Sequence, residues 1–145
     1  MPNPIPKGLH TVTPYLVVSD AAKVMDFIRR AFGATERYKM QGPNGAVMHA
    51  EMQVGDSVVM LGQSPDASRS TRSMLHLYVP DVDAVYKQAI AAGGISVREP
   101  ADQFYGDRSG AVKDPGGNEW SIATHKEDVS PEEMQRRMAA QRANA

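Results

Sequence analysis

The sequence predicts an α+β fold made of two similar modules, each with the element order β-α-β-β-β. A Val-x-Asp junction at Val18-Ser19-Asp20 returns about 60 residues later at Val79-Pro80-Asp81. Each junction precedes a helical pattern, a glycine and then a strand that opens with Gly-Ala-Val, at Gly45 and at Gly110. A repeated order of this kind indicates two modules that need each other to close one core.

The length and charge of the chain favour one domain without a polyanionic partner. At 145 residues the chain has the usual size of a single domain, which we expect to span residues 1–145. Its 16 Lys and Arg nearly balance its 17 Asp and Glu, so nothing favours nucleic acid or an anionic membrane. No apolar run approaches the roughly 20 residues of a membrane helix, and the Pro-rich start lacks the apolar segment of a signal peptide. We therefore expect a cytoplasmic protein.

The absence of cysteine restricts the chemistry of the chain. Because it contains no cysteine, the sequence offers no disulfide, no thiolate metal ligand and no cysteine nucleophile. It also contains no phosphate-binding glycine loop with a lysine, no zinc-protease helix and no nucleophile elbow. Any catalysis must therefore use oxygen or imidazole groups.

The first module is expected at residues 11–62. Its helix begins at Ser19 or Asp20, because these side chains cap helix N-termini, and Gly33 follows its last turn. Val24, Phe27 and Ile28 recur at helical spacing and predict the buried face. We expect strands at residues 13–18, 35–40, 46–54 and 57–61.

The second module is expected at residues 73–125, after a polar linker at residues 63–72. We expect a helix at residues 82–92 and strands at residues 74–79, 95–99, 110–113 and 119–123. The stretch from Pro100 to Arg108 fits the repeat less well and is expected to be irregular.

A C-terminal tail helix is expected at residues 130–142. Ser130-Pro131-Glu132-Glu133 forms a capping box with proline at the first helical position. Met134 and Met138 share one face and can dock on the body or on a second subunit.

The two strand-Asp-helix junctions and the closing Asp114-Pro115-Gly116-Gly117-Asn118-Glu119-Trp120 resemble the vicinal oxygen chelate superfamily. This superfamily holds glyoxalases, bleomycin-resistance proteins and extradiol dioxygenases. Further motifs resemble its PhnB-like subgroup. They are Pro14-Tyr15-Leu16, Ala31-Phe32-Gly33-Ala34, His49-Ala50-Glu51, Tyr105-Gly106-Asp107-Arg108 and Trp120-Ser121-Ile122-Ala123-Thr124-His125. The resemblance implies a homodimer with a glyoxalase-type open barrel or cleft, formed by two modules of one chain or of swapped partners.

The resemblance also implies a divalent metal ion held mostly by His and Glu in that cleft. The corresponding positions in this chain fall on Thr13, Glu51, Met74 and Ser121. Only Glu51 is a good ligand for such an ion, so the usual metal site is degenerate.

A shifted metal site is one hypothesis for the remaining polar groups. His49, His76 and Glu119 each lie two residues from one of the implied ligand positions and share its strand face. Together with Glu51 they can form a four-ligand site. The alternative is that these groups hydrogen-bond each other or a ligand.

His49 and Glu51 are also the expected catalytic residues. Glu51 can orient His49 as a general base, although a histidine on a strand is more often structural. The expected ligand-binding residues are His76, Tyr105, Arg108, Glu119 and Ser121. The arginine can bind a carboxylate or phosphate, and the alternative is an Asp107–Arg108 pair that fixes the loop. Trp120 is expected in the core, and His125 has no expected role.

Two functions follow from these residues and the resemblance. The first is a small-molecule-binding enzyme, a glyoxalase-like lyase or isomerase that uses His49 and Glu51 with or without a displaced metal ion. The second is a protein that sequesters an antibiotic or metabolite in the cleft without altering it. The degenerate metal site favours sequestration or metal-free chemistry.

Overall fold

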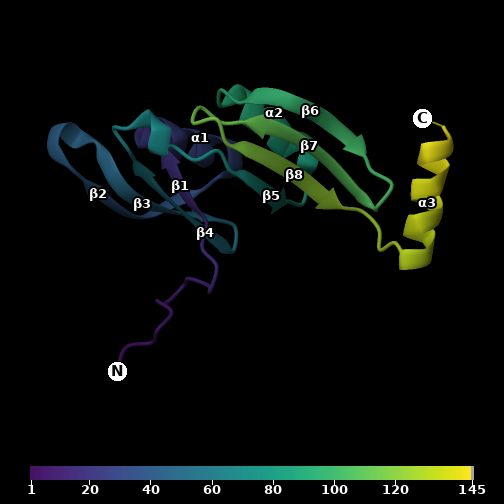
Figure 1. Ribbon diagram of the computed structural model, residues 1–145, viewed down its shortest axis with the longest axis horizontal. Coiled ribbons are helices and arrows are strands. Elements are labelled where there is room, and N and C mark those ends of the chain that lie inside the picture. Colours follow the sequence, from purple (N-terminus) through teal and green to yellow (C-terminus); the bar gives the residue numbers. More distant parts are fainter. Residues whose placement is uncertain (145) are drawn as a thin grey trace.

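Each half of the chain folds into a four-stranded sheet with a helix on one face, as the repeat predicts (Figure 1). The computed structural model describes residues 1–144. The two sheets lie side by side and remain open, and a C-terminal helix follows the second one. The predicted α+β fold of two β-α-β-β-β modules is thus confirmed.

The first sheet has the strand order β1-β4-β3-β2. Its elements are β1 (Tyr15–Val18), α1 (Ala21–Phe32), β2 (Thr35–Gln41), β3 (Val47–Val54) and β4 (Ser57–Gln63). The strand β1 pairs in parallel with β4, while the other neighbours are antiparallel. Two short 3-10 turns, Pro43–Gly45 and Ala67–Arg69, lie in the connections.

The second sheet repeats this topology with the order β5-β8-β7-β6. Its elements are β5 (Met74–Tyr78), α2 (Val82–Ala91), β6 (Ile95–Asp102), β7 (Asp107–Lys113) and β8 (Glu119–His125). Again the first strand, β5, pairs in parallel with the last, β8. The first strand of each module is therefore an edge strand.

The repeated aspartates begin the two module helices. The Asp20 carboxylate accepts a hydrogen bond from the Lys23 backbone N–H at 3.1 Å, and Asp81 accepts one from Ala84 at 3.2 Å. These bonds satisfy donors that the first helical turn leaves unpaired. Gly33 then ends α1 in the left-handed conformation, with φ of 67°, which glycine adopts without strain.

The stretch from Pro100 to Arg108 is a strand pair, so the expected irregular loop was wrong. The strand β6 continues to Asp102 and β7 already begins at Asp107. Because β6 is an edge strand, Pro100 interrupts no central ladder, and the register shifts between Arg98 and Ala101. A Cβ on Gly110 would lie 3.0 Å from the Pro100 nitrogen, so only glycine lets this bulge pack closely.

The modules meet through their helices and one aromatic contact. The helices α1 and α2 pack against each other, and the Phe32 ring lies 4.9 Å from the fully buried Trp120 ring. Within residues 1–144, no strand of one sheet pairs with a strand of the other. The edges of β1 and β5 therefore face each other without joining.

A buried carboxylate fixes Trp120 in this contact. Asp114 is 4 % exposed and accepts hydrogen bonds from the Trp120 indole at 2.8 Å and from the backbone N–H groups of Gly116 and Asn118 at 2.7 and 3.0 Å. The turn before β8 thus has a structural role, as the sequence indicates.

The C-terminal helix α3 (Pro131–Ala143) lies beside the far end of the second sheet (Figure 1). Arg137 tethers it by donating to the Phe104 carbonyl at 3.1 Å and by pairing with Glu127 at 2.5 Å. Met134 and Met138 are half-buried. The helices formed by residues 1–144 are all too short or too polar to cross a membrane.

The substitution Asp114→Asn is expected to lower the free energy of unfolding by about 2–3 kcal/mol, because an amide cannot accept all three buried N–H donors. Urea denaturation measures this loss. The matched control is Asp26→Asn, since Asp26 makes only exposed ion pairs with Arg29 and Arg30 and should change stability by no more than about 0.5 kcal/mol. Equal stability of Asp114→Asn and the wild type would contradict this account of the turn.

Candidate functional site

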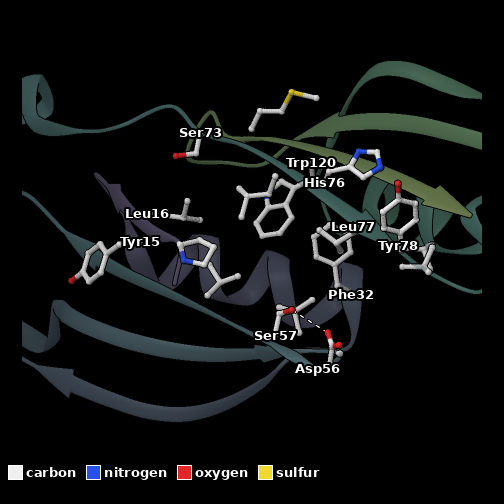
Figure 2. A pocket seen from close by; sticks show the side chains of 18 of the residues that line it. Tyr15, Leu16, Phe32, Asp56, Ser57, Ser73, His76, Leu77, Tyr78 and Trp120 are labelled. Atoms are coloured by element: carbon white, nitrogen blue, oxygen red, sulfur yellow. Dashed lines mark hydrogen bonds between the residues drawn. The ribbon is translucent and has the colours of Figure 1, made fainter. Parts of the chain in front are cut away.

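A cavity of 960 Å³ lies between the edge strands β1 and β5 (Figure 2). Tyr15 and Leu16 line it from β1, and His76, Leu77 and Tyr78 line it from β5. Phe32 and Trp120 lie between these strands, and Asp56 and Ser57 of the β3–β4 hairpin lie at the lower rim in Figure 2. The contact that joins the modules therefore also forms the wall between them.

The linker leaves part of the β1 edge open. Thr71 donates its N–H to the Val17 carbonyl at 3.0 Å, and its hydroxyl accepts the Val17 N–H at 3.2 Å. This pairing covers the end of β1 nearest the helix. The edge around Tyr15 stays beside the cavity.

Alternation along β5 separates the side chains that pack on the core from those that are exposed, although both sets border the cavity. Leu75 and Leu77 pack against the buried core, whereas His76 and Tyr78 are exposed. The His76 and Tyr78 rings meet edge to face, with centroids 4.9 Å apart. Two polar aromatic groups are thus presented together at one wall.

Tyr78 is connected to a buried carboxylate and a histidine. Its hydroxyl donates to Asp107 Oδ2 at 3.3 Å, and Asp107 Oδ1 lies 2.8 Å from His125 Nδ1. His125 Nε2 in turn lies 2.8 Å from Asp128 Oδ1. Asp107 is 5 % exposed, so three strands bring these groups to one end of the second sheet.

The carboxylates of Asp107 and Asp128 shift the pKa values of Tyr78 and His125. The negative charge of Asp107 raises the pKa of Tyr78, because a phenolate beside a carboxylate is unfavourable. Hydrogen bonds to Asp128 and Asp107 raise the pKa of His125 above its ordinary value. The phenol therefore stays protonated, with its hydrogen directed at Asp107.

The predicted catalytic residues His49 and Glu51 lie together on the first sheet. His49 Nε2 is 3.7 Å from Glu51 Oε2, and His49 Nδ1 shares a hydrogen bond of 3.1 Å with the Tyr15 hydroxyl. Arg37 Nη1 lies 3.6 Å from Glu51 Oε1. Neither His49 nor Glu51 lines the cavity, but Tyr15 connects the pair to it.

The predicted ligand-binding residues lie in different places. His76 lines the cavity, whereas Glu119 and Ser121 on β8 do not, although Ser121 lies directly opposite His76 in the sheet. Ser121 is almost fully buried. Tyr105 packs edge to face with Phe104 outside the cavity.

Arg108 is held by aspartates on two other elements. Its guanidinium donates to both oxygens of Asp83 at 2.9 and 3.0 Å and also contacts Asp102 at 3.4 Å. These bonds raise the pKa of Arg108 and lower that of Asp83. Asp107 instead binds Tyr78 and His125, so the alternative of an Asp107–Arg108 pair was wrong.

The residues of one chain do not fit a divalent metal ion. The implied ligand positions offer a threonine, an exposed thioether and a buried serine beside Glu51, which is a poor donor set. For the shifted site, His49 and Glu51 lie on the first sheet and His76 and Glu119 on the second. No three His, Asp or Glu residues within positions 1–144 are close enough to hold an ion.

Three groups at the site have no role in the sequence interpretation: Tyr15, Tyr78 and His125. Tyr78 lies two residues after His76 on β5, so the two side chains point to the same face. Alternation along β5 therefore could have predicted that Tyr78 lies beside His76. His125 gave no such signal, because its partner Asp107 lies 18 residues away on β7.

Two β-α-β-β-β modules with a cavity between their first strands define the class of this fold. The sequence profile of the Glyoxalase/Bleomycin resistance protein/Dioxygenase superfamily matches residues 8–122. The chain belongs to this superfamily, which confirms the resemblance at that level.

Relatives support the same assignment. The protein Mb0911c of Mycobacterium bovis is 36% identical over 141 residues, which cover 90% of this chain and 93% of that protein. The crystal structure of TioX from Micromonospora sp. ML1 is similar with a TM-score of 0.70 and 25% identity, covering 80% of this chain and 98% of that one. The PhnB protein from Bacillus cereus shares the fold, with a TM-score of 0.63 and 16% identity over 79% of this chain and 99% of its own.

The substitution Asp128→Asn is expected to lower the pKa of His125 and to destabilise the protein in a pH-dependent way. Since the folded pKa of His125 is raised, its protonated form stabilises the fold below its ordinary pKa of about 6.5, and this stabilisation is lost as pH rises through the folded pKa. The stability gap between wild type and variant should therefore be larger at pH 6 than at pH 9.

Titration of the His125 ring protons by NMR, with urea denaturation at both pH values, measures these two effects. An unchanged His125 pKa in the variant would contradict the assigned contacts.

Proposed function

We propose that the protein binds a small organic molecule in the cavity between β1 and β5. The observation that carries this proposal is the cavity itself, which is walled by apolar and aromatic side chains with a few polar groups. Its 960 Å³ falls within the range of about 300–1,000 Å³ typical of ligand sites. Sequestration of an antibiotic or metabolite needs only this lining and no metal ion.

A second candidate is acid–base catalysis by a glyoxalase-like lyase or isomerase. The contacts of His49 with Glu51 and with the Tyr15 hydroxyl favour it, because Tyr15 lines the cavity. In such a reaction the Tyr15 hydroxyl takes a proton from the carbon beside a carbonyl and passes its own proton to His49 Nδ1, and Glu51 stabilises the imidazolium that forms. Glu51 already lies between His49 and Arg37, so its charge is partly compensated.

We further infer that the working form is a cytoplasmic homodimer of the PhnB-like subgroup. The helix-free sheet faces expose Tyr38 and Met40 on β2 and Met74 on β5, which a second subunit can cover. In a dimer that placed these faces together, His49 and Glu51 of one chain would approach His76 and Glu119 of the other. A shared divalent-metal site and the ligand roles of Tyr105, Arg108 and Ser121 remain predictions.

The neutral fluorescent probe 9-(hydroxymethyl)anthracene is expected to bind in the cavity and to raise the melting temperature by a few degrees at saturation. The variant Ser57→Trp should abolish binding, because its indole occupies the rim of the cavity. Fluorescence anisotropy, with excitation above the tryptophan absorption band, measures the affinity.

The matched control is Ser19→Trp, which is exposed and outside the cavity and should bind as the wild type does. Circular dichroism establishes that both variants fold. Equal binding by the two variants would place the probe elsewhere and refute the proposed site.

The catalytic candidate predicts exchange of hydrogen for deuterium in 2-hydroxyacetophenone dissolved in D₂O. The C–H bond beside the carbonyl breaks, a proton passes through Tyr15 to His49, and a solvent deuteron replaces it on carbon. The variant His49→Ala should slow this exchange about 100-fold or more, whereas His10→Ala, at an exposed histidine far along the N-terminal arm, should not. Mass spectrometry follows the deuterium, and exchange no faster than buffer would leave sequestration as the function.

A further inference from the structure

We propose that the cavity selects flat organic cations, such as protonated aromatic amines, over anions of the same shape. This inference rests on the proposed binding function and adds the chemical class of the ligand. Three independent features of the lining carry it: its charge, the direction of its hydroxyl hydrogens and its exposed aromatic faces.

The charge of the lining is negative. Among the described residues that line the cavity, none is a lysine or arginine, and Asp56 supplies a carboxylate at the rim. Two arginines are engaged elsewhere, since Arg37 pairs with Glu51 and Arg108 pairs with Asp83. An anionic ligand therefore finds the His76 imidazole but no lysine or arginine on these walls, and it meets a carboxylate at the entrance.

Two of the lining hydroxyls, those of Ser57 and Tyr78, point their hydrogens away from a ligand. Ser57 donates its hydroxyl hydrogen to Asp56 at 3.0 Å, a bond drawn in Figure 2, and Tyr78 donates its own to Asp107 at 3.3 Å. Each oxygen keeps lone pairs that can only accept. The open edge of β5 offers both N–H and C=O groups and so gives no preference of its own. The Ser57 and Tyr78 hydroxyls and the rim carboxylate together favour a ligand that donates.

The aromatic side chains favour a flat cation in particular. Tyr15 and Tyr78 stand on opposite sides of the cavity and are 44% and 66% exposed, with Phe32 between them (Figure 2). Ring faces attract cations and stack on flat apolar ligands. A ligand with an ammonium group on an aromatic ring system can stack on the tyrosine ring faces and donate hydrogen bonds to the hydroxyl and carboxylate oxygens.

Three anthracene derivatives of one shape test the proposal. They carry a 9-aminomethyl group, a 9-hydroxymethyl group or a 9-carboxylate, so they share one ring system and differ chiefly in the charge of a small substituent near neutral pH. At pH 8, where free imidazole is neutral, the amine should bind about tenfold more tightly than the carboxylate, with the alcohol between them. Fluorescence anisotropy titrations measure the three dissociation constants.

The variant Asp56→Asn should reduce the preference for the amine about threefold, because the rim carboxylate is exposed and screened. The matched control Asp26→Asn lies on α1 outside the cavity and should leave the preference unchanged. A carboxylate that bound as tightly as the amine would overturn the cation proposal and leave the binding function standing. If none of the three bound, or if Ser57→Trp bound all three as the wild type does, both proposals would fail.

Discussion

The packing of α1 against α2, with the contact between the Phe32 and Trp120 rings beside it, sets the arrangement of the two modules. No ladder of backbone hydrogen bonds links the sheets formed by residues 1–144, so side-chain packing and the bond from Arg30 to the Ala91 carbonyl hold them together. Phe32 ends α1 and Trp120 lies on β8, and Asp114 holds the indole by its N–H. The same rings line the cavity, because the space between the edge strands lies beside their contact. Core packing and the ligand site therefore share atoms.

Each sheet adds a polar network to the cavity from its own side. The first sheet contributes Tyr15, which binds His49, and the second contributes Tyr78, which binds Asp107. Tyr15 begins the edge strand β1 and Tyr78 ends the edge strand β5. Alternation along each strand places the tyrosine ring outside the core. The two networks differ in chemistry, since Tyr78 faces a buried carboxylate whereas Tyr15 faces an imidazole. The two walls of the cavity therefore differ in the group that lies behind each tyrosine.

Local signals in the sequence predicted most of the fold. The Asp20 and Asp81 caps, the apolar stripe of α1 and the turn at Asp114 each act over a few residues, so a single sequence contains them. Pro100 misled the prediction because its tolerance depends on β6 being an edge strand, which is a property of the whole sheet.

The site was less predictable for the same reason. Alternation placed His49 and Glu51 on one face, and they do lie together. The group of Tyr78, Asp107 and His125 instead depends on the register of three strands that are distant in sequence. No pattern within one strand carries that register, so neither the group nor the cavity beside it follows from local periodicity.

The most direct test of the account is an NMR structure of the complex with 9-(aminomethyl)anthracene. Trp120 is the single tryptophan of the chain, so its indole protons give one unambiguous NMR signal beside the cavity. The account predicts nuclear Overhauser effects from the anthracene protons to the rings of Trp120, Phe32 and Tyr78. Effects confined to Tyr38 and Met40 on the outer strand of the first sheet would contradict it.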